Sequence, residues 1–399
     1  MQNNEEVLLK VENLSQYFGF TKAVDDVSFD IKKGEVFGLV GESGCGKTTT
    51  GRSIIKLYNI TGGNVFFKGI RIAAGKKVYQ DAIKKAQEDF KTESAAHPEK
   101  TAELKAQMNA TIAEQRKLMK AADFDQKNCD KEYSKQLQQQ AKEKYEALLA
   151  KADEAAKPGL MAEYKDAMRK AKNTKLVTQI QMIFQDPIAS LDPRMTVKEI
   201  ISEGLVIQGE RNKEVLDEKV YEMLDLVGLV REHASRYPHE FSGGQRQRIG
   251  VARSIIMNPE LIIADEPVSA LDVSVQAQVI NLLNELREKF GLTILFIAHD
   301  LSVVKYFSDR IGVMYFGKMV ELATSDELFK NPLHPYTRSL LSAIPLPDPI
   351  YEKSRQRITY NPLAEHDYTV DKPSFREITP GHFVQCNDAE FAKYQQMLK

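Results

Sequence analysis

The chain has 399 residues, of which 42% are apolar, and a formal net charge of −1. This length allows a sizeable core and more than one domain. Proteins that bind nucleic acid through its phosphates are usually basic, so we expect no nucleic acid partner. No run approaches the roughly 18 apolar residues of a membrane span, so we expect any membrane location to come from partner subunits.

Strand-like runs separated by glycine turns occupy the first part of the chain, at 7–11, 27–31 and 36–40. The run at 36–40 is apolar without alternation, as expected for a strand that is buried on both faces of a parallel sheet. A glycine-rich turn and a helix-like segment follow it. This order predicts the beginning of an α/β fold with a parallel sheet.

The turn after residue 40 matches the phosphate-binding loop G-x-x-x-x-G-K-[ST]. Glycines let backbone N–H groups approach a phosphate, and the following helix points its positive end at the same anion. We expect Lys47 to reach the β- and γ-phosphates of ATP and Thr48 to bind Mg²⁺ through its hydroxyl. A chance glycine loop is the alternative. The residues predicted to contact the nucleotide here are Gly41, Ser43, Gly44, Cys45, Gly46, Lys47, Thr48 and Thr49.

Residues 76–175 differ in composition from the rest of the chain. They are rich in alanine, lysine, glutamate and glutamine, and contain no glycine between Gly75 and Gly159. Apolar residues recur every three or four positions, which predicts amphipathic helices. We expect two long helices that are joined near 123–130 as an antiparallel hairpin and are flanked by shorter helices. A working arm and a solvated helical scaffold are both open interpretations of this insertion.

The α/β pattern resumes from residue 176, and its apolar run at 261–264 ends in two adjacent carboxylates. Asp265 is expected to hold Mg²⁺ through water, and Glu266 to act as the general base that orients the attacking water. The alternative is a buried strand that ends in two acidic residues by chance. Beyond about residue 345 we expect an irregular tail with a short helix at 388–398.

The segment 241–248 resembles the signature motif of ABC ATPases, with Phe241 in place of the usual leucine. Its serine and two glycines would open a helix and so present a second anion site. In the ABC family this site faces the γ-phosphate bound by the other subunit, so the resemblance implies a dimer. An ordinary serine-capped helix is the alternative. The signature residues predicted to contact nucleotide are Ser242, Gly243, Gly244 and Gln245.

Three further positions extend the resemblance to ABC ATPases. Gln185 matches the Q-loop glutamine, which in the family contacts Mg²⁺ and senses the membrane partner. Asp272 matches the end of the D-loop, which crosses the dimer interface and adds to the nucleotide site. His299 matches the switch histidine, which contacts the γ-phosphate and positions the water.

The aromatic residue that stacks on adenine in the family is expected about 23 residues before the loop, which selects Phe18, with Tyr17 as the second choice. Either ring could instead belong to the core. In sum, the predicted catalytic residues are Glu266, His299, Lys47 and Gln185, and the predicted metal ligands are Thr48, Gln185 and Asp265.

Longer segments are similar to the F-type ATP-binding subunit of oligopeptide and dipeptide permeases, at 44–52, 184–197, 299–315 and 331–345. The last of these resembles a C-terminal extension peculiar to that family. The resemblance implies import of oligopeptides or dipeptides at the expense of ATP, with Mg²⁺ as cofactor. The implied partners are a second ABC ATPase subunit (a related D-type chain or a second copy), two transmembrane permease subunits and an extracellular or periplasmic solute-binding protein. The implied location is peripheral, at the cytoplasmic face of the membrane.

The fold that we predict is α/β, a P-loop ATPase core with an antiparallel β subdomain, a helical subdomain that bears the signature, and a long helical insertion. Import of nickel or of a sugar oligomer is an alternative, and a soluble ABC ATPase acting on nucleic acid or ribosomes is less favoured. The expected domains are 1–75 (first part of the core, with the phosphate loop), 76–175 (insertion), 176–330 (rest of the core) and 331–399 (C-terminal extension and tail).

Overall fold

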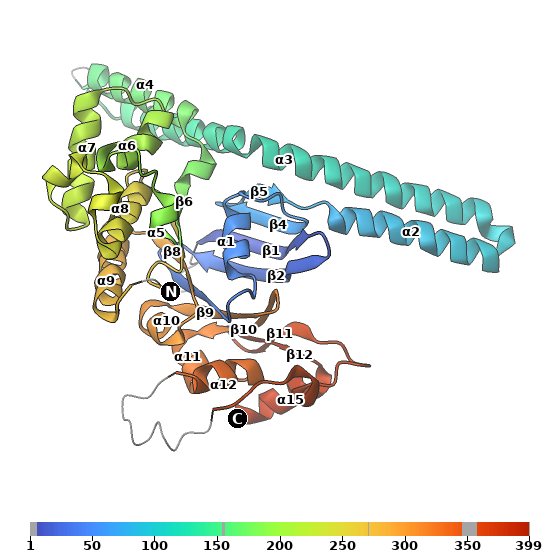
Figure 1. The fold of residues 1–399 in the computed structure, drawn as a ribbon. Helices are drawn as coiled ribbons and strands as arrows, with labels where there is room; N and C mark the ends of the chain where they lie inside the picture. The colour runs from blue at the N-terminus through green and yellow to red at the C-terminus, as the bar shows by residue number, and fades with distance from the viewer. Residues whose placement is uncertain (1–5, 154–155, 270, 345–356, 399) are drawn as a thin grey trace.

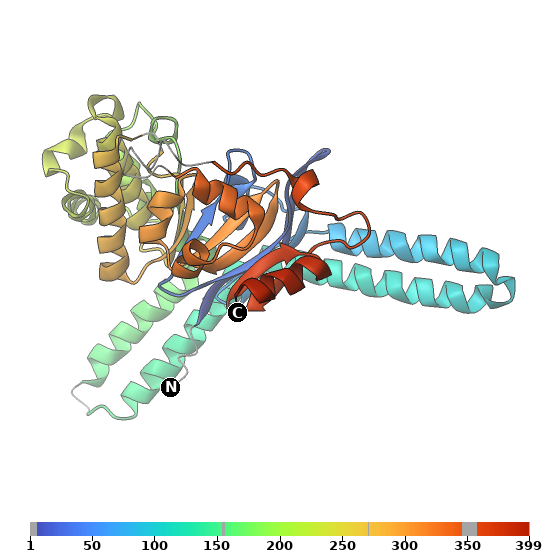
Figure 2. The ribbon, with the colours of Figure 1, turned by 90° about the horizontal axis from the view of Figure 1, so that it is seen from below.

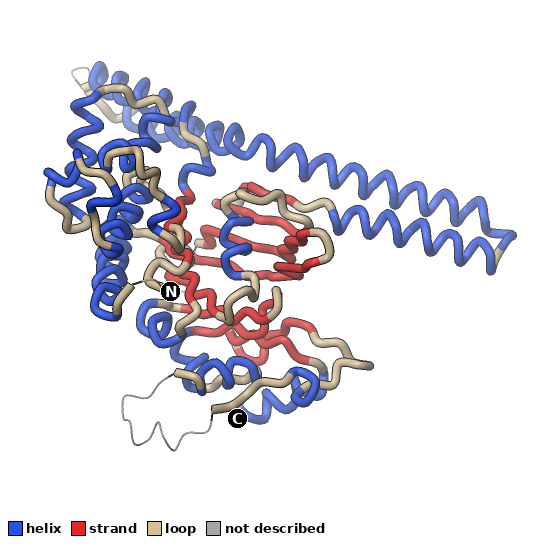
Figure 3. Tube along the Cα trace, viewed as in Figure 1, coloured by secondary structure: helices blue, strands red, loops and turns tan. Residues whose placement is uncertain are grey.

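The computed structural model describes residues 6–153, 156–269, 271–344 and 357–398. Strands gather at the centre of the molecule and helices surround them (Figure 3). Two sheets are present in the described residues, one of four strands and one of eight. No helix in these residues is long and apolar enough to cross a membrane.

The smaller sheet is antiparallel, in the order β2-β1-β4-β5. It matches the antiparallel β subdomain that was predicted for the core. Strand β2 buries alternate side chains at Val27, Phe29 and Ile31, as the period of two along a strand predicts, whereas β1 also buries neighbouring residues. The strands are β1 (Val7–Phe18), β2 (Thr21–Lys32), β4 (Gly62–Phe67) and β5 (Ile70–Ala74).

The larger sheet has the order β11-β12-β10-β9-β3-β8-β7-β6. Strands β9 to β6 of this order are parallel, whereas β10, β12 and β11 are added antiparallel at one edge. The apolar runs β3, β7 and β8 are buried throughout, which confirms the predicted parallel core. The strands are β3 (Val36–Val40), β6 (Ile180–Ile183), β7 (Leu261–Asp265), β8 (Thr293–Ala298), β9 (Arg310–Tyr315), β10 (Lys318–Thr324), β11 (Ser374–Thr379) and β12 (His382–Cys386).

Two apolar cores lie against opposite faces of the larger sheet. One core joins Phe37 of β3 to Ile54 of α1 and to the smaller sheet, and the other joins Val36 of β3 to Ile249 of α8. Helices α1 and α8 therefore cover opposite faces. The helices outside the insertion are α1 (Lys47–Ile54), α5 (Pro187–Ser190), α6 (Val197–Ile207), α7 (Lys213–Leu226), α8 (Gly243–Ile255), α9 (Val273–Phe290), α10 (Leu301–Phe307), α11 (Ser325–Lys330), α12 (Pro335–Ser342), α14 (Pro362–Glu365) and α15 (Asp388–Met397), with 3₁₀ turns at Leu176–Gln179, Arg231–Ser235 and Pro238–Glu240.

The insertion between β5 and β6 consists of α2 (Lys77–Ala96), a 3₁₀ turn (Pro98–Lys100), α3 (Thr101–Leu149) and α4 (Lys157–Asn173). Helix α2 runs beside the first part of α3, and α4 beside its last part (Figure 1). The two helix pairs project from the core on different sides (Figure 2).

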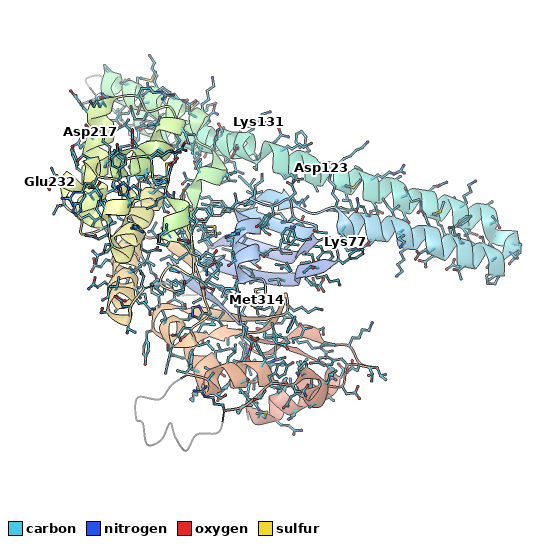
Figure 4. The ribbon with its side chains drawn as sticks, in the orientation of Figure 1. Lys77, Asp123, Lys131, Asp217, Glu232 and Met314 are labelled. Carbon is cyan, nitrogen blue, oxygen red and sulfur yellow. The ribbon has the colours of Figure 1, made fainter. Side chains whose placement is uncertain are left out.

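The predicted turn near 123–130 is wrong, because the 49-residue helix α3 passes through it without a break. Two aspartates there, a residue type that favours turns, instead form ion pairs with β5 and with the residue that precedes α2. Asp123 pairs with Lys76 at 2.8 Å and Asp125 pairs with Arg71 at 3.4 Å, and Figure 4 labels Asp123 on this part of α3. Tertiary contacts thus override local propensity.

The expectation of an irregular tail is wrong for residues 374–386, where β11 and β12 form an antiparallel hairpin. Strand β12 pairs with β10, so the tail extends the larger sheet. The helix predicted at 388–398 is present as α15, which ends at Met397. Residues 345–356 lie outside the described part of the chain.

Candidate active site

Four neighbouring parallel strands, β3, β8, β7 and β6, end at one edge of the larger sheet. The phosphate loop follows β3, His299 follows β8, Glu266 follows β7, and Gln185 lies two residues after β6. Ligands of α/β proteins bind at the carboxyl ends of such strands. The structure therefore brings the predicted catalytic residues to one edge.

Glycine is required at two positions of the phosphate loop. Gly41 has φ +149°, and a Cβ atom there would lie 2.2 Å from the carbonyl oxygen of Met314. Gly46 has φ +106°, and a Cβ atom there would lie 2.2 Å from the carbonyl oxygen of Ala23. Side chains at these positions would push the loop away from β9 and β2, so the close backbone packing explains the two glycines.

Lys47 begins α1 and is 4% exposed. Its Nζ donates hydrogen bonds to the carbonyl oxygens of Gly41 at 2.7 Å and Glu42 at 2.9 Å. The ammonium group thus lies inside the turn of the loop, where a phosphate would compete for it. Of the other predicted loop residues, Ser43 and Gly44 are exposed, Thr49 is half-buried, and Cys45 is buried, which raises the pKa of its thiol.

The hydroxyl of Thr48 donates to Oδ1 of Asp265 at 2.8 Å. Asp265 is fully buried, and burial raises the pKa of its carboxyl group, against the opposing effects of Thr48 and Arg52. Its second oxygen, Oδ2, has no hydrogen-bond partner in the described residues. A hydroxyl and an unsatisfied carboxylate oxygen are ligands of the kind that Mg²⁺ prefers, so this pair fits a Mg²⁺ ion.

The carboxylate of Glu266 contacts two other residues that were predicted to be catalytic, Gln185 and His299. Its Oε2 accepts a hydrogen bond from Nε2 of Gln185 at 3.1 Å and lies 3.3 Å from Nδ1 of His299. Glu266 also has φ +44°, a sparsely populated conformation for a residue with a side chain. Its N–H donates to the carbonyl oxygen of Ile297 at 2.9 Å, which ties this backbone to β8. The arrangement suits a general base that is held in place by an amide and an imidazole.

The signature segment begins α8. Ser242 and Gln245 form a reciprocal capping box, in which each side chain accepts from the other residue's N–H. Gly243 and Gly244 pack beside Leu271 and the first turn of α9. Asp272, at the N-terminus of α9, is exposed, whereas Ala270 of the D-loop lies outside the described residues. Because α8 and α1 cover opposite faces of the larger sheet, the predicted second anion site is built separately from the phosphate loop.

Neither predicted adenine-stacking ring is tested by the structure. Phe18 is 46% exposed and packs edge-on against Tyr58, with ring centroids 5.2 Å apart. The hydroxyl of Tyr17 donates to Asp25, and the amino group of Lys22 lies over its ring. Both rings stay predictions for the adenine contact, and Phe18 is the more exposed of the two.

Sequence reasoning missed a contact between the C-terminal extension and the phosphate loop. The N–H of Glu42 donates to the hydroxyl of Tyr336 in α12 at 3.0 Å, across 294 positions of the chain. The ring of Tyr336 is 1% exposed. No local pattern in the sequence signals a contact over this separation.

The chain matches two family models. Residues 24–153 and 146–269 match the ABC transporter family, and residues 320–369 match the C-terminal region of oligopeptide/dipeptide transporters. Among solved structures, cbiO1 from Clostridium perfringens, part of an ABC transporter complex, has a TM-score of 0.52 at 20% identity, covering 82% of this chain and 92% of its own. A nucleotide-free ATP-binding cassette from an ABC transporter has a TM-score of 0.50 at 21% identity, covering 82% and 94%. These likenesses confirm the predicted fold.

Full-length relatives are also similar in sequence. The oligopeptide transport ATP-binding protein OppF of Bacillus subtilis is 48% identical over 394 residues, covering 98% of this chain and 99% of the relative. OppF of Streptococcus pyogenes is 43% identical, covering 98% and 99%, and the dipeptide transport ATP-binding protein DppF of Lactococcus lactis is 42% identical, covering 98% and 97%. Family model, relatives and fold agree with the motifs at the strand ends. The chain therefore belongs to the ABC transporter family of ATP-binding proteins.

Proposed function

We propose that this chain is the ATP-hydrolysing subunit of an importer of oligopeptides or dipeptides. The observation that carries the ATPase role is the convergence of Gln185 and His299 on the carboxylate of Glu266, beside the pair formed by Thr48 and Asp265. The cargo is supported by the transporter-type C-terminal region and by relatives whose names specify oligopeptides and a dipeptide.

ATP binding begins at the phosphate loop. Lys47 leaves the carbonyl oxygens of Gly41 and Glu42 to meet the β- and γ-phosphates, and the N-terminus of α1 faces the same anion. Thr48 and Asp265 are the residues that would hold Mg²⁺, with Gln185 as a further candidate. The ion would neutralise phosphate charge and orient the phosphoryl group.

Glu266 acts on the attacking water. Its carboxylate accepts a proton or orients the water by hydrogen bonding, while Gln185 and His299 limit its movement. In the catalytic arrangement His299 turns to the γ-phosphate, so that one histidine connects the base to the reacting group. The left-handed backbone of Glu266 fixes the direction of its side chain at the end of β7.

A complete site takes residues from two cassettes. Helices α1 and α8 lie on opposite faces of the larger sheet, which favours a site in which Ser242, Gly243 and Gly244 of one subunit cover the phosphate loop of another. A related D-type ATPase is the proposed second subunit. Closure of the pair over ATP would move two transmembrane permease subunits at the cytoplasmic face of the membrane, and a solute-binding protein would deliver the peptide.

Uptake of a labelled short peptide tests this function in cells that produce the native chain, Glu266→Gln or Glu285→Gln as their only copy. Glu285 is exposed on α9 and serves as the matched control. We expect uptake to collapse in cells with Glu266→Gln and to stay near native in cells with Glu285→Gln. Native uptake with Glu266→Gln would contradict the peptide cargo, and labelled nickel or a sugar oligomer would then be tested in the same strains.

A further inference from the structure

The first turn of α12 lies against the phosphate loop. The hydroxyl of Tyr336 accepts the N–H of Glu42 at 3.0 Å. The ring is buried against Tyr315, with centroids 4.4 Å apart, and against Tyr360, with centroids 5.5 Å apart. A buried ring between two others has little freedom to turn, so its hydroxyl is presented to the loop in a fixed position.

The start of α12 is itself anchored by a buried carboxylate. Glu321 of β10 is fully buried and accepts the N–H groups of Leu333 at 2.8 Å and His334 at 3.0 Å. The same carboxylate lies 2.8 Å from Nε2 of His382 in β12. Two strands of the larger sheet therefore fix the backbone that immediately precedes Tyr336, and the C-terminal hairpin is connected to the phosphate loop through an unbroken series of contacts.

The Gly41–Glu42 segment is held from two sides. Lys47 binds the carbonyl oxygens of Gly41 and Glu42 from inside the turn, and Tyr336 binds the N–H of Glu42 from α12. A phosphate that draws Lys47 away removes the inner contacts but leaves the outer one. Of these three contacts, the hydrogen bond to Tyr336 then alone holds the segment, so its loss should destabilise the nucleotide-bound state more than the free state and so weaken ATP binding.

We propose that Tyr336 is a positioning residue for nucleotide binding: its hydroxyl holds the phosphate loop in shape when Lys47 moves to the phosphates. The inference rests on the proposed role of residues 41–48 as the phosphate loop. It assigns the C-terminal extension a part in ATP binding that acts through the phosphate loop.

The test compares Tyr336→Phe with Tyr360→Phe in the full chain. Each variant loses one hydroxyl from the same aromatic cluster, but Tyr336 alone of the two bonds Glu42 in the described structure. ATP with Mg²⁺ is titrated by calorimetry, and turnover is measured at saturating ATP. An unpaired N–H in the loop should raise the Kd for ATP about fivefold in Tyr336→Phe. Turnover at saturation should stay near the native value, because Glu266 and His299 are untouched.

Hydrogen exchange of the 36–47 peptide in the presence of ATP provides a second readout. We expect faster exchange of this peptide in Tyr336→Phe, with native exchange elsewhere and in Tyr360→Phe. Native ATP affinity in Tyr336→Phe, equal weakening in both variants, or faster exchange over the whole chain would each overturn the proposal. Lys47→Ala distinguishes failure of the role proposed for Tyr336 from failure of the proposed function. Native ATP affinity in that variant would contradict the proposed function itself.

Discussion

At the strand ends of the larger sheet, the side chains predicted to bind ATP and Mg²⁺ include buried ones, whereas most of the helical insertion is exposed. Lys47 and Asp265 are buried and bonded to residues from other elements. In the insertion, α2 buries no residue, α4 buries only Ala171, and the buried residues of α3 all fall between Ala122 and Ser134 in the described structure. At the strand ends, the change of a single side-chain atom should therefore alter binding or turnover. In the insertion, only the short buried segment of α3 attaches the helices to the rest of the protein.

The largest expected effect lies at the strand ends, in purified Glu266→Gln. Replacing the carboxylate by an amide keeps the shape but removes the base, so turnover should fall about 100-fold or more. Binding of ATP, measured by calorimetry, should stay near native. Turnover within a few-fold of native would show that another group orients the water and that Glu266 is not the general base.

Two tyrosines of α3 sharpen the comparison within one helix. Tyr133 is 6% exposed and accepts a hydrogen bond at 3.0 Å from Lys68 in the turn between β4 and β5, whereas Tyr145 is half-buried and packs on Tyr164 of α4. Tyr133→Ala should lower the free energy of unfolding by about 3 kcal/mol, and Tyr145→Ala by less than about 1 kcal/mol. Urea denaturation of both variants measures these losses, and equal losses would mean that α3 is attached along its whole length.

The buried histidine before α12 predicts that the stability of the chain depends on pH. Burial, with His366 and Arg338 nearby, lowers the pKa of His334 from 6.5 to about 3. Below pH 6.5 the unfolded chain binds a proton that the folded chain excludes. The free energy of unfolding should therefore fall with decreasing pH from 6.5 towards 3, by up to about 1.4 kcal/mol per pH unit from this group.

Urea denaturation at pH 7, 6 and 5 measures this slope. His334→Asn should flatten it, because asparagine has no proton to bind and can still cap the helix. The matched control is His97→Asn at the exposed turn between α2 and α3, which should keep the native curve. A native curve for His334→Asn would assign the slope to other groups.

The smallest expected effect is a shortened insertion. Removing residues 85–95 and 102–112 takes about three turns from each of α2 and α3 and keeps the faces of both helices aligned. The docked part of α3 is untouched. Turnover of the purified chain should stay within about twofold of native, as for other changes away from buried contacts. A tenfold loss would show that the distal hairpin takes part in ATP hydrolysis.

The sequence predicted the strand ends well because their chemistry is local. The glycines, Lys47 and Thr48 lie within positions 41–48, and the strands before this loop, Glu266 and His299 are short, mostly apolar runs. The course of α3 was not predictable in this way. Asp123 and Asp125 favour turns in isolation, and their partners Lys76 and Arg71 lie some 50 residues away, so only the folded structure reveals why the helix continues.

The prediction of an irregular tail was wrong for a related reason. Residues 374–386 form strands because β10 offers an open edge, and neither half of the hairpin carries a long apolar run. The contact of Tyr336 with Glu42 likewise depends on Glu321, which fixes the backbone before α12. Such contacts are set by the assembled sheet and have no counterpart in the local sequence.

Because α3 is attached to the rest of the protein by its middle, the helix can act as a lever that pivots about the docked segment, Ala122–Ser134. Its 49 residues leave one arm before Ala122 and another after Ser134, and at 1.5 Å per residue these arms extend for about 32 Å and about 23 Å. A rotation of α3 by about 5° around the centre of the docked segment would carry each end of the helix through about 3 Å, in opposite directions. Small rearrangements of the smaller sheet are thereby magnified at two distant points of the surface.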